Sequence, residues 1–343
     1  MVQRVLEQSV KIQDFNLKKT FIIAEIGNNH EGNYQLAKKM ISLASKAGVD
    51  AVKFQTYKTS FFINKNEKKR FKKLKNFELS YDQFKSLKKI ANKLGLFFIS
   101  TPFDLESADF LSKNSDMIKI ASSDNNFFKL IEIVLKSQKP VIVSTGLADI
   151  NEIKKIVLLA KKILKNKFNK NFALLHCVSA YPVEPEYANL NSIKFLKEKF
   201  KCIIGYSDHT IGNEASLVAI SLGAKIVEKH FTIDKKYSSF RDHQLSADFI
   251  DLKNIVDSAR KIELMLGKKN KILQKNESIN LKGFRRSIVS NKDLKKGVKL
   301  TEKDVKYLRP GNGLDPNQIK KILNKMLKRN LQSDQVIKMS DIL

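Results

Sequence analysis

The sequence predicts a (β/α)8 barrel, also called a TIM barrel, followed by a small β-rich module. Two observations carry this prediction. From about residue 20 to about residue 265, short apolar runs of strand length alternate with longer amphipathic segments. The pattern then changes, through a polar stretch rich in Lys and Asn, to a final segment of turn residues and short apolar runs.

Eight strands are expected, and several of the segments between them have the spacing of helices. The strands are Phe21–Glu25, Ala51–Gln55, Phe97–Thr101, Met117–Ala121, Val141–Ser144, Phe172–His176, Cys202–Tyr206 and Lys225–His230. The helices are Tyr34–Ala47, Tyr81–Leu94, Ile150–Leu164, Leu190–Phe200 and Asn213–Leu222, and Gly48, Gly95 and Gly223 stand where a left-handed cap is needed. Eight regular units favour a closed barrel, and a doubly wound sheet is the alternative.

The domain boundaries follow from the same pattern. We expect the barrel over residues 1–266, a linker over 267–282 and the module over 283–343. Strand-like runs in the module are Arg286–Ser290, Val305–Leu308 and Gln335–Met339. A module of roughly 60 residues has a small core, so we expect it to pack against another part of the protein.

Composition excludes several classes of protein. The formal net charge of +29 suggests nucleic-acid binding, but the cations are mostly Lys, spread over the expected helices and not clustered as Arg. No apolar run approaches the ~20 residues that span a membrane, and Met1–Lys19 lacks the apolar core of a signal peptide. Cys177 and Cys202 are expected to be buried free thiols. We therefore expect a cytoplasmic protein with neither a membrane nor a nucleic acid as partner.

Polar residues stand at or just after the end of every expected strand. In a barrel of this class the carboxyl ends of the strands form the active site, so these side chains converge on one rim. They are Glu25; Lys53 and Gln55; Thr101; Lys119, Ser122 and Asp124; Ser144; His176, Ser179 and Tyr181; Ser207 and His209; and Glu228 and His230. Because a core layer would hold Val, Ile and Leu there, the convergence indicates an enzyme.

Two lysines within otherwise apolar strands predict an anion site. Buried ammonium groups are costly unless they are paired, which makes Lys53 and Lys119 candidates for binding an anion. Together with the hydroxyl groups of Thr101, Ser122, Ser144 and Ser207, they would cradle a phosphate or a carboxylate. In the alternative, the lysines pair with Glu25, Asp124 or Glu228 in a structural network.

Two histidines predict a metal site. His209 and His230 end adjacent strands, 21 residues apart, so their imidazoles can meet. Imidazole suits a divalent metal, and only two protein ligands would leave the site open for catalysis. A lone histidine is more often a core residue whose hydrogen bonds are satisfied, and the pair on neighbouring strand ends is what favours the metal.

Seven motifs in chain order resemble the sialic acid synthase family, the bacterial enzymes that make N-acetylneuraminate, legionaminate and pseudaminate. The motifs are Ala24-Glu25-Ile26-Gly27-Asn28-Asn29-His30, Lys53-Phe54-Gln55-Thr56, Ser100-Thr101-Pro102-Phe103, Lys119-Ile120-Ala121-Ser122, Ser144-Thr145-Gly146, Gly205-Tyr206-Ser207-Asp208-His209-Thr210 and Glu228-Lys229-His230-Phe231-Thr232. The segment Leu308-Arg309-Pro310-Gly311 resembles the antifreeze-like (SAF) domain of that family.

The resemblance implies that a divalent metal, preferably manganese with magnesium as the alternative, assists condensation of phosphoenolpyruvate with an N-acylated mannosamine-type sugar. The family positions that hold phosphoenolpyruvate match Lys53, Thr101, Lys119, Ser122, Ser144 and Ser207. The metal ligands match His209 and His230, and the catalytic acid or base matches Glu25. The sugar contacts match Gln55, Asp124, Tyr181 and Asp242, and Arg309 matches an arginine that reaches the sugar across a domain-swapped homodimer.

Three positions depart from the family pattern. The family often has Glu at the position of Asp124, and some members have Asn at the position of Ser179. Where the family usually has Gly-Pro-Asp, this chain has Phe240-Arg241-Asp242, and the next residue, His243, is a candidate polar contact. A competing interpretation is a Schiff-base aldolase with Lys53 or Lys119 as the nucleophile.

Overall fold

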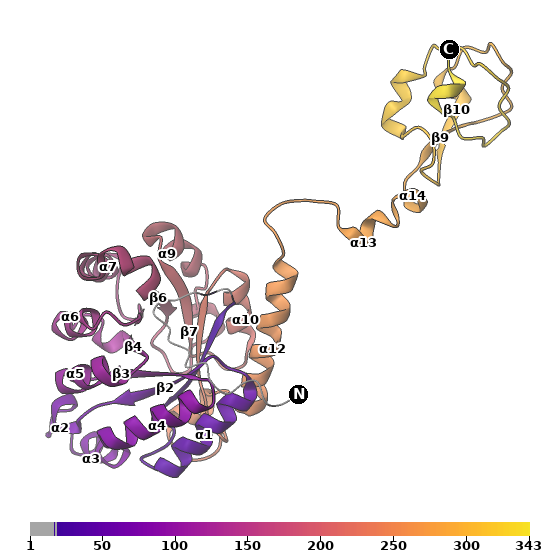
Figure 1. Cartoon of the computed structure of the whole chain (residues 1–343). Coiled ribbons are helices and arrows are strands. Elements are labelled where there is room, and N and C mark those ends of the chain that lie inside the picture. The colour runs from indigo at the N-terminus through magenta and orange to yellow at the C-terminus, as the bar shows by residue number, and fades with distance from the viewer. Residues whose placement is uncertain (1–16, 18) are drawn as a thin grey trace. The chain divides into compact units, whose positions relative to one another are not determined.

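The computed structural model describes residue 17 and residues 19–343, and it divides the chain into two compact units, Met1–Gly267 and Lys268–Leu343 (Figure 1). The first unit is a closed barrel of eight parallel strands, which confirms the predicted fold. The expectation for Met1–Lys19 falls almost entirely outside the described residues. In the part that is described, no helix is both long and apolar enough to cross a membrane.

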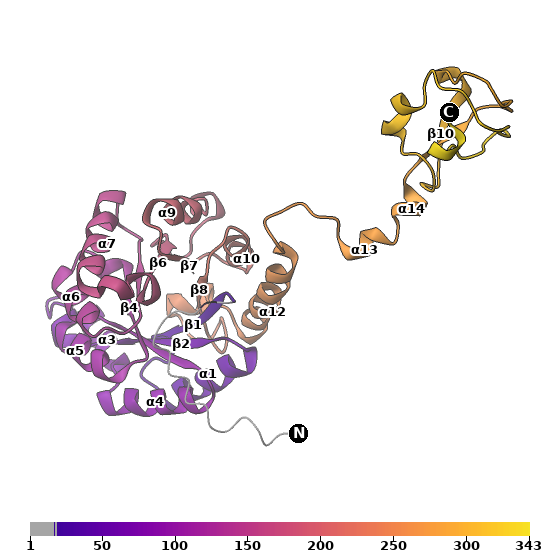
Figure 2. The same ribbon diagram turned by 45° about the horizontal axis from the view of Figure 1, so that its top comes forward.

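The eight strands pair in chain order, and the last pairs with the first to close the barrel (Figure 2). They are β1 (Phe21–Gly27), β2 (Ala51–Thr56), β3 (Phe97–Pro102), β4 (Met117–Ile120), β5 (Val141–Ser144), β6 (Phe172–Cys177), β7 (Ile203–Asp208) and β8 (Ile226–His230). Each lies within two residues of its predicted end, because a run buried on both faces is apolar throughout. Because the strands are parallel, their carboxyl ends all lie at one end of the barrel, where the polar residues are found.

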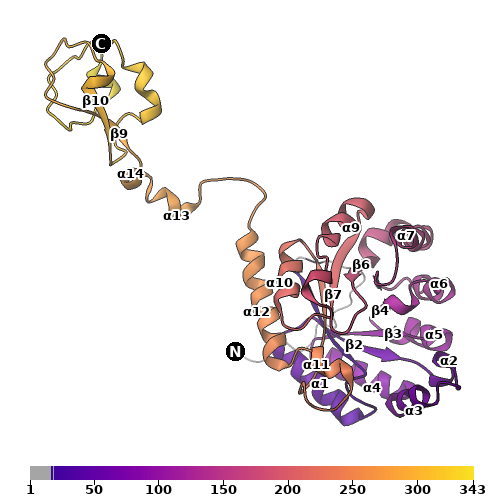
Figure 3. The same ribbon diagram turned by 180° about the vertical axis from the view of Figure 1, so that it is seen from behind.

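Helices surround the barrel, and each predicted helix is present. They are α1 (Tyr34–Ala47), α2 (Thr59–Phe62), α3 (Lys68–Phe77), α4 (Tyr81–Lys93), α5 (Leu105–Asn114), α6 (Phe128–Lys136), α7 (Ile150–Leu164), α8 (Phe168–Asn171), α9 (Ser192–Phe200), α10 (Glu214–Ser221), α11 (Arg241–Leu245) and α12 (Phe249–Leu266). The last of these, α12, packs on both α1 and α10 and so completes the ring (Figure 3). Local sequence sets the helix ends: Asn33 caps the start of α1, and Gly48 ends it in the left-handed conformation.

The barrel unit has two apolar cores. The larger lies between the helices and the outer face of the sheet, where residues such as Ile22, Phe54 and Val143 meet the apolar faces of the helices. The smaller lies inside the barrel at its amino-terminal end and includes Ile99 and Ile142. Above this inner plug the barrel interior becomes polar.

The second unit is a small module with its own core. It begins with the short helices α13 (Lys275–Ser278) and α14 (Leu281–Phe284), within the segment predicted to be a linker. Its sheet has two antiparallel strands, β9 (Ser287–Ser290) and β10 (Val305–Leu308). The predicted strand Gln335–Met339 is too long: it pairs with β9 only through an isolated bridge at Val336 and the backbone hydrogen bonds on either side of it, and the chain turns into a 3-10 helix at Met339.

Candidate active site

The carboxyl ends of the strands surround a cavity of about 660 Å³. All the residues predicted at the rim or in the site line this cavity except three, Asp124, His176 and Arg309. The ring of His176 instead packs on Tyr206, and its Nε2 lies 2.8 Å from the carbonyl oxygen of Ala188. The lining residues that the sequence predicted are Glu25, Lys53, Gln55, Thr101, Lys119, Ser122, Ser144, Ser179, Tyr181, Ser207, His209, Glu228, His230 and Asp242. Eight different strands and their loops therefore bring one set of polar side chains into a space large enough for small-molecule substrates.

Two lysines and two glutamates form a buried network at the floor of the cavity. The Lys53 ammonium lies 2.9 Å from Glu25 and 3.7 Å from Glu228, and the Lys119 ammonium lies 3.5 Å from Glu228. The two lysines therefore have carboxylate partners, as expected if they pair with Glu25 and Glu228 in a structural network. Asp124 takes no part, and its carboxylate accepts a hydrogen bond from Ser123 instead.

The two carboxyl groups of this network differ in their proton affinity. Burial raises the pKa of Glu25, and the single close ammonium of Lys53 offsets this only in part. Burial acts on Glu228 in the same direction, but the ammonium groups of Lys119 and Lys53 together bring its pKa below the ordinary value. Glu25 is therefore suited to exchanging a proton, whereas Glu228 serves as a fixed negative charge.

Glu228 is a functional candidate that the sequence analysis placed at the rim but gave no role beyond pairing with a lysine. It lies two residues before His230 on β8, and in a strand such residues point to the same face. Since His230 was predicted to face the site, the alternation could have identified Glu228 as well.

The two predicted metal ligands lie side by side. The rings of His209 and His230 have centroids 5.4 Å apart, and Nδ1 of His209 lies 2.9 Å from the carbonyl oxygen of Val178. A carbonyl only accepts, so this Nδ1 carries a proton. Burial acts to lower the pKa of His209, but the neighbouring Cys177 thiol and the Val178 carbonyl raise it overall, so Nε2 offers a lone pair to a metal once the ring is neutral. Burial holds the pKa of His230 well below its ordinary value, and among residues 17 and 19–343 its Nδ1 has no hydrogen-bond partner.

These features fit a divalent metal, which neutral imidazoles bind. Across residues 19–343 and residue 17, no group of three or more His, Cys, Asp and Glu residues could hold a metal ion. Any metal bound by His209 and His230 would therefore take its remaining ligands from water or substrate, which is the open arrangement of a catalytic site.

Several buried hydroxyl groups face the cavity without a protein partner. The Oγ atoms of Ser122, Ser144 and Ser179 are buried and make no hydrogen bond within the described residues. Buried polar atoms are nearly always paired in proteins, so these three indicate a ligand. Gly146 leaves room for two of them, because a Cβ there would meet Ser179 Oγ at 2.4 Å and Ser122 Oγ at 2.7 Å.

The wall of the cavity carries further polar groups. Gln55 accepts a hydrogen bond from Asn28 at 2.8 Å, and its amide nitrogen lies 3.5 Å from Glu25. On the opposite side, the guanidinium of Arg241 stacks 4.6 Å from the centre of the Tyr181 ring and lies 3.3 Å from Asp242. These groups can bind the hydroxyl groups of a sugar.

Helix α3 supplies lining residues that the sequence analysis missed. Arg70 and Lys73 line the outer part of the cavity. The segment Lys68–Phe77 is dominated by lysine and has few apolar residues, so its helical period was hidden by charge. The apolar positions Phe71, Leu74 and Phe77 were the pattern that could have revealed it.

Arg309 belongs to the second unit. Its side chain is exposed, and its guanidinium lies 6.0 Å from the centre of the Phe284 ring. The two cysteines are free, with Cys177 buried at the cavity and Cys202 partly buried.

The chain matches two family models, the NeuB family over residues 40–271 and the SAF domain over residues 285–343. The chain belongs to the NeuB family. The N,N'-diacetyllegionaminic acid synthase of Legionella pneumophila is 37% identical to it over 91% of this chain and 92% of that protein. The pseudaminic acid synthase of Campylobacter jejuni is 36% identical over 97% of this chain and 99% of that protein.

A solved structure gives the same picture of the fold. The crystal structure of N-acetylneuraminic acid (sialic acid) synthetase from Leptospira borgpetersenii superposes with a TM-score of 0.72 and 36% identity, over 76% of this chain and 90% of that one. The predicted resemblance to nonulosonic acid synthases is thus confirmed, and this NeuB-family chain is an enzyme of that kind.

Proposed function

We propose that this enzyme condenses phosphoenolpyruvate with the open-chain aldehyde of an N-acylated mannosamine-type sugar, giving a nonulosonic acid and phosphate. The observation that carries the proposal is the floor of the cavity, where a Lys–Glu network lies beside two imidazoles and three unpartnered hydroxyl groups. The NeuB-family relatives named above make different sugar acids, which supports an N-acyl amino sugar as the substrate class.

Phosphoenolpyruvate carries a phosphate and a carboxylate, and the floor of the cavity can bind both. In the part of the chain that the structure describes, Lys119 has one carboxylate partner, at 3.5 Å, so most of its three N–H groups can turn to a ligand. Lys53 also donates to Thr101, at 3.3 Å, and Ser122 and Ser144 offer free hydroxyl groups. Ser207 donates to Glu228 at 3.0 Å and completes the predicted set.

His209 and His230 would hold the divalent metal, preferably manganese with magnesium as the alternative. A metal in this position supplies Lewis-acid polarisation of a carbonyl oxygen. The two imidazoles come from adjacent strands and are held by a packed barrel, which fixes their relative position.

Glu25 is the proposed acid or base. In the proposed reaction the methylene carbon of phosphoenolpyruvate forms a bond to the aldehyde carbon, and water adds to the carbon that bears the phosphate. Glu25, whose pKa is raised by burial, accepts one proton of that water and returns a proton to the aldehyde oxygen, which becomes a hydroxyl group, while the second proton of the water leaves with the phosphate. Cleavage of the bond between this carbon and the phosphate oxygen then releases phosphate.

Gln55, Tyr181, Asp242 and Asp124 are the proposed sugar contacts within the barrel, and Arg309 is proposed to reach the sugar from a second subunit of a domain-swapped homodimer. The exposure of Arg309 on a separate compact module supports this role. The test mixes two inactive variants, Glu25→Ala and Arg309→Ala, after subunit exchange. Recovered activity is expected, because a mixed dimer holds one barrel with Glu25 beside a module with Arg309. No recovery despite demonstrated exchange would contradict a shared site.

The test of the reaction itself measures phosphate release from phosphoenolpyruvate with a panel of hexosamines. Release is expected with an N-acylated mannosamine-type sugar and with a metal, and not with phosphoenolpyruvate alone. Absence of release with every sugar, in the presence of manganese, would contradict the proposal.

One observation favours a second function. Burial lowers the pKa of Lys119, and a buried lysine with a lowered pKa is also the nucleophile of a Schiff-base aldolase. Borohydride treatment in the presence of pyruvate separates the two functions. A covalent adduct on Lys119 would support the aldolase, and its absence, together with phosphate release, supports the synthase.

A further inference from the structure

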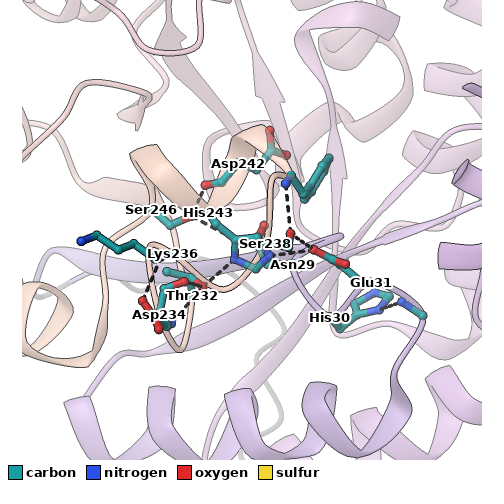
Figure 4. Close-up of polar contacts among 12 residues, drawn as sticks. Asn29, His30, Glu31, Thr232, Asp234, Lys236, Ser238, Asp242, His243 and Ser246 are labelled. Atoms are coloured by element: carbon teal, nitrogen blue, oxygen red, sulfur yellow. Dashed lines mark hydrogen bonds and ion pairs between the residues drawn. The ribbon is translucent and has the colours of Figure 1, made fainter.

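The loops that follow β1 and β8 meet in a cluster of polar contacts beside the cavity (Figure 4). At its centre, Nε2 of His243 lies 3.1 Å from a carboxylate oxygen of Glu31. The His243 side chain is fully buried. A carboxylate oxygen can only accept here, so the imidazole Nε2 donates this hydrogen bond.

Further contacts hold this pair in place. Nδ1 of His243 lies 2.7 Å from the Thr232 hydroxyl, and the Ser238 hydroxyl donates to the same oxygen of Glu31. The ring of Phe240 packs against the His243 ring, with 6.0 Å between the ring centroids. Glu31 and His243 therefore join the loop after β1 to the segment that leads from β8 into α11.

A second attachment lies one turn further along. The side-chain amide of Asn29 donates to the carbonyl of Phe231 and to the hydroxyl of Ser246, both at 2.9 Å. The Ser246 hydroxyl in turn donates to the backbone carbonyl of Asp242. The middle of α11, at His243, and its carboxyl-terminal cap, at Ser246, are thus both tied to the β1 loop.

Asp242 lies at the start of this segment, and its side chain lines the cavity. Within the described residues, its carboxylate has one side-chain partner, Arg241 at 3.3 Å, whose own side chain is largely exposed. Such a partner restrains a carboxylate weakly. The position of the Asp242 carboxylate is therefore set by the backbone of α11, and hence by the residues that hold that backbone.

We propose that Glu31 and His243 form a positioning latch that places Asp242 at the sugar side of the cavity. This inference rests on the proposed function, because it assigns Asp242 to the sugar. Neither latch residue lines the cavity, so the latch acts through the backbone. The proposed phosphoenolpyruvate contacts come from β2 to β5 and β7, which the latch does not touch.

The kinetic test uses Glu31→Gln and Glu31→Ala, because the Glu31 side chain is 24% exposed and tolerates substitution better than the buried ring. With phosphoenolpyruvate and a panel of N-acetylated hexosamines, we expect Glu31→Ala to raise the apparent KM for the sugar roughly tenfold, a typical effect of a misplaced contact. The apparent KM for phosphoenolpyruvate should change less than about twofold. His243→Gln keeps a donor for Glu31 and should retain most of the sugar affinity that His243→Ala loses.

The matched control is Lys236→Ala. Lys236 lies on the same loop, with an exposed side chain outside the cavity, so sugar affinity should stay unchanged. Hydrogen exchange of the free protein gives a readout that needs no substrate. The amides of His243, Ser246 and Ala247 donate to the carbonyl groups of Phe240, His243 and His230 respectively. Glu31→Ala should speed the exchange of these three amides, while the amides of the barrel strands keep their protection.

The outcomes separate this inference from the proposed function. An active wild type whose Glu31 and His243 variants change both apparent KM values equally, or neither, would overturn the latch. Unchanged exchange in this segment would also overturn it. A wild type that releases no phosphate with any sugar would overturn the proposed function, and with it the role given to Asp242, even where the exchange result confirms the contact.

Discussion

The two halves of the barrel interior are built from the same strands but hold opposite kinds of side chain. At the amino-terminal end, the inward residues form an apolar plug that includes Ile23, Ile99 and Ile142. Two residues further along the same strands, the inward residues are Glu25, Thr101 and Ser144, which line the cavity. β2 and β4 repeat the change, from Ala51 to Lys53 and from Met117 to Lys119, and β8 from Ile226 to Glu228.

The difference shows how the barrel separates stability from chemistry. The apolar half removes surface from water and packs at the density of a protein interior, which stabilises the fold. The polar half buries two ammonium groups and two carboxyl groups. The free-energy cost of removing these charges from water is offset only in part by their pairing. Substitutions in the two halves should therefore have separable effects, and the predictions below test that separation.

The largest effect is expected at the polar end. His230→Ala should abolish both turnover and metal binding, because it removes one of two proposed ligands, while unfolding stability changes by about 1 kcal/mol or less. Metal content and activity would be measured together, and chelated wild type reloaded with manganese serves as the control. Full activity of the chelated protein would rule out the metal site.

The next effect is expected at the apolar end. Ile142→Ala should lower the free energy of unfolding by about 2–5 kcal/mol, because it leaves a cavity in the buried plug. Below the unfolding transition its kcat should stay within about twofold of wild type. Urea unfolding monitors the first quantity, and Ile142→Val, with an expected cost of about 0.5–1.5 kcal/mol, is the matched control. A large loss of kcat without loss of stability would mean that the two halves are not separable.

A smaller effect is expected for the ammonium groups. Lys53→Ala and Lys119→Ala each remove a charge-assisted contact worth about 1.5–3 kcal/mol, which corresponds to roughly ten- to a hundredfold in a binding constant. The loss should appear in the apparent affinity for phosphoenolpyruvate more than in that for the sugar. Steady-state kinetics with each substrate varied in turn would show this. Unchanged affinity for phosphoenolpyruvate in both variants would place the anion site elsewhere.

The smallest effect concerns pH at the amino-terminal end. Burial, with the charge of Lys88 nearby, lowers the pKa of Lys139 to about 8, and its ammonium donates to the carbonyl of Ser115, just before β4. Between pH 8 and about 10.5 the unfolded chain binds more protons at this lysine than the folded one. Its contribution to stability should therefore rise with pH across that window, by less than about 1 kcal/mol since the group is partly exposed.

This pH effect would be measured as the difference between wild type and Lys139→Met in urea unfolding at pH 7.5, 9 and 10. Activity per folded molecule should not depend on Lys139, which lies at the opposite end of the barrel from the cavity. The stability of wild type relative to Lys139→Met should rise with pH, as the lowered pKa of Lys139 requires. A relative stability that falls as pH rises would contradict this expectation.

Some features of the site followed from sequence because they are local. Strands buried on both faces must be apolar, so eight apolar runs located the strands, and a polar residue at the end of such a run stood out. Lys53, Lys119, His209 and His230 were found in this way. In the module, Gln335–Met339 pairs with β9 only around Val336, because a short apolar run does not itself specify how far the pairing with a neighbouring strand extends.

The sequence by itself determined the barrel, the position of each strand and the set of polar residues at the rim, because all of these depend on period and spacing along one chain. Only the tertiary structure decided which residues pair across the rim of the barrel. It showed that Lys53 and Lys119 share Glu228, and that α3 reaches the cavity. It also brought Glu31 to His243 across 212 residues. Such contacts depend on closure of the barrel, which places distant segments side by side, and no local pattern encodes that distance.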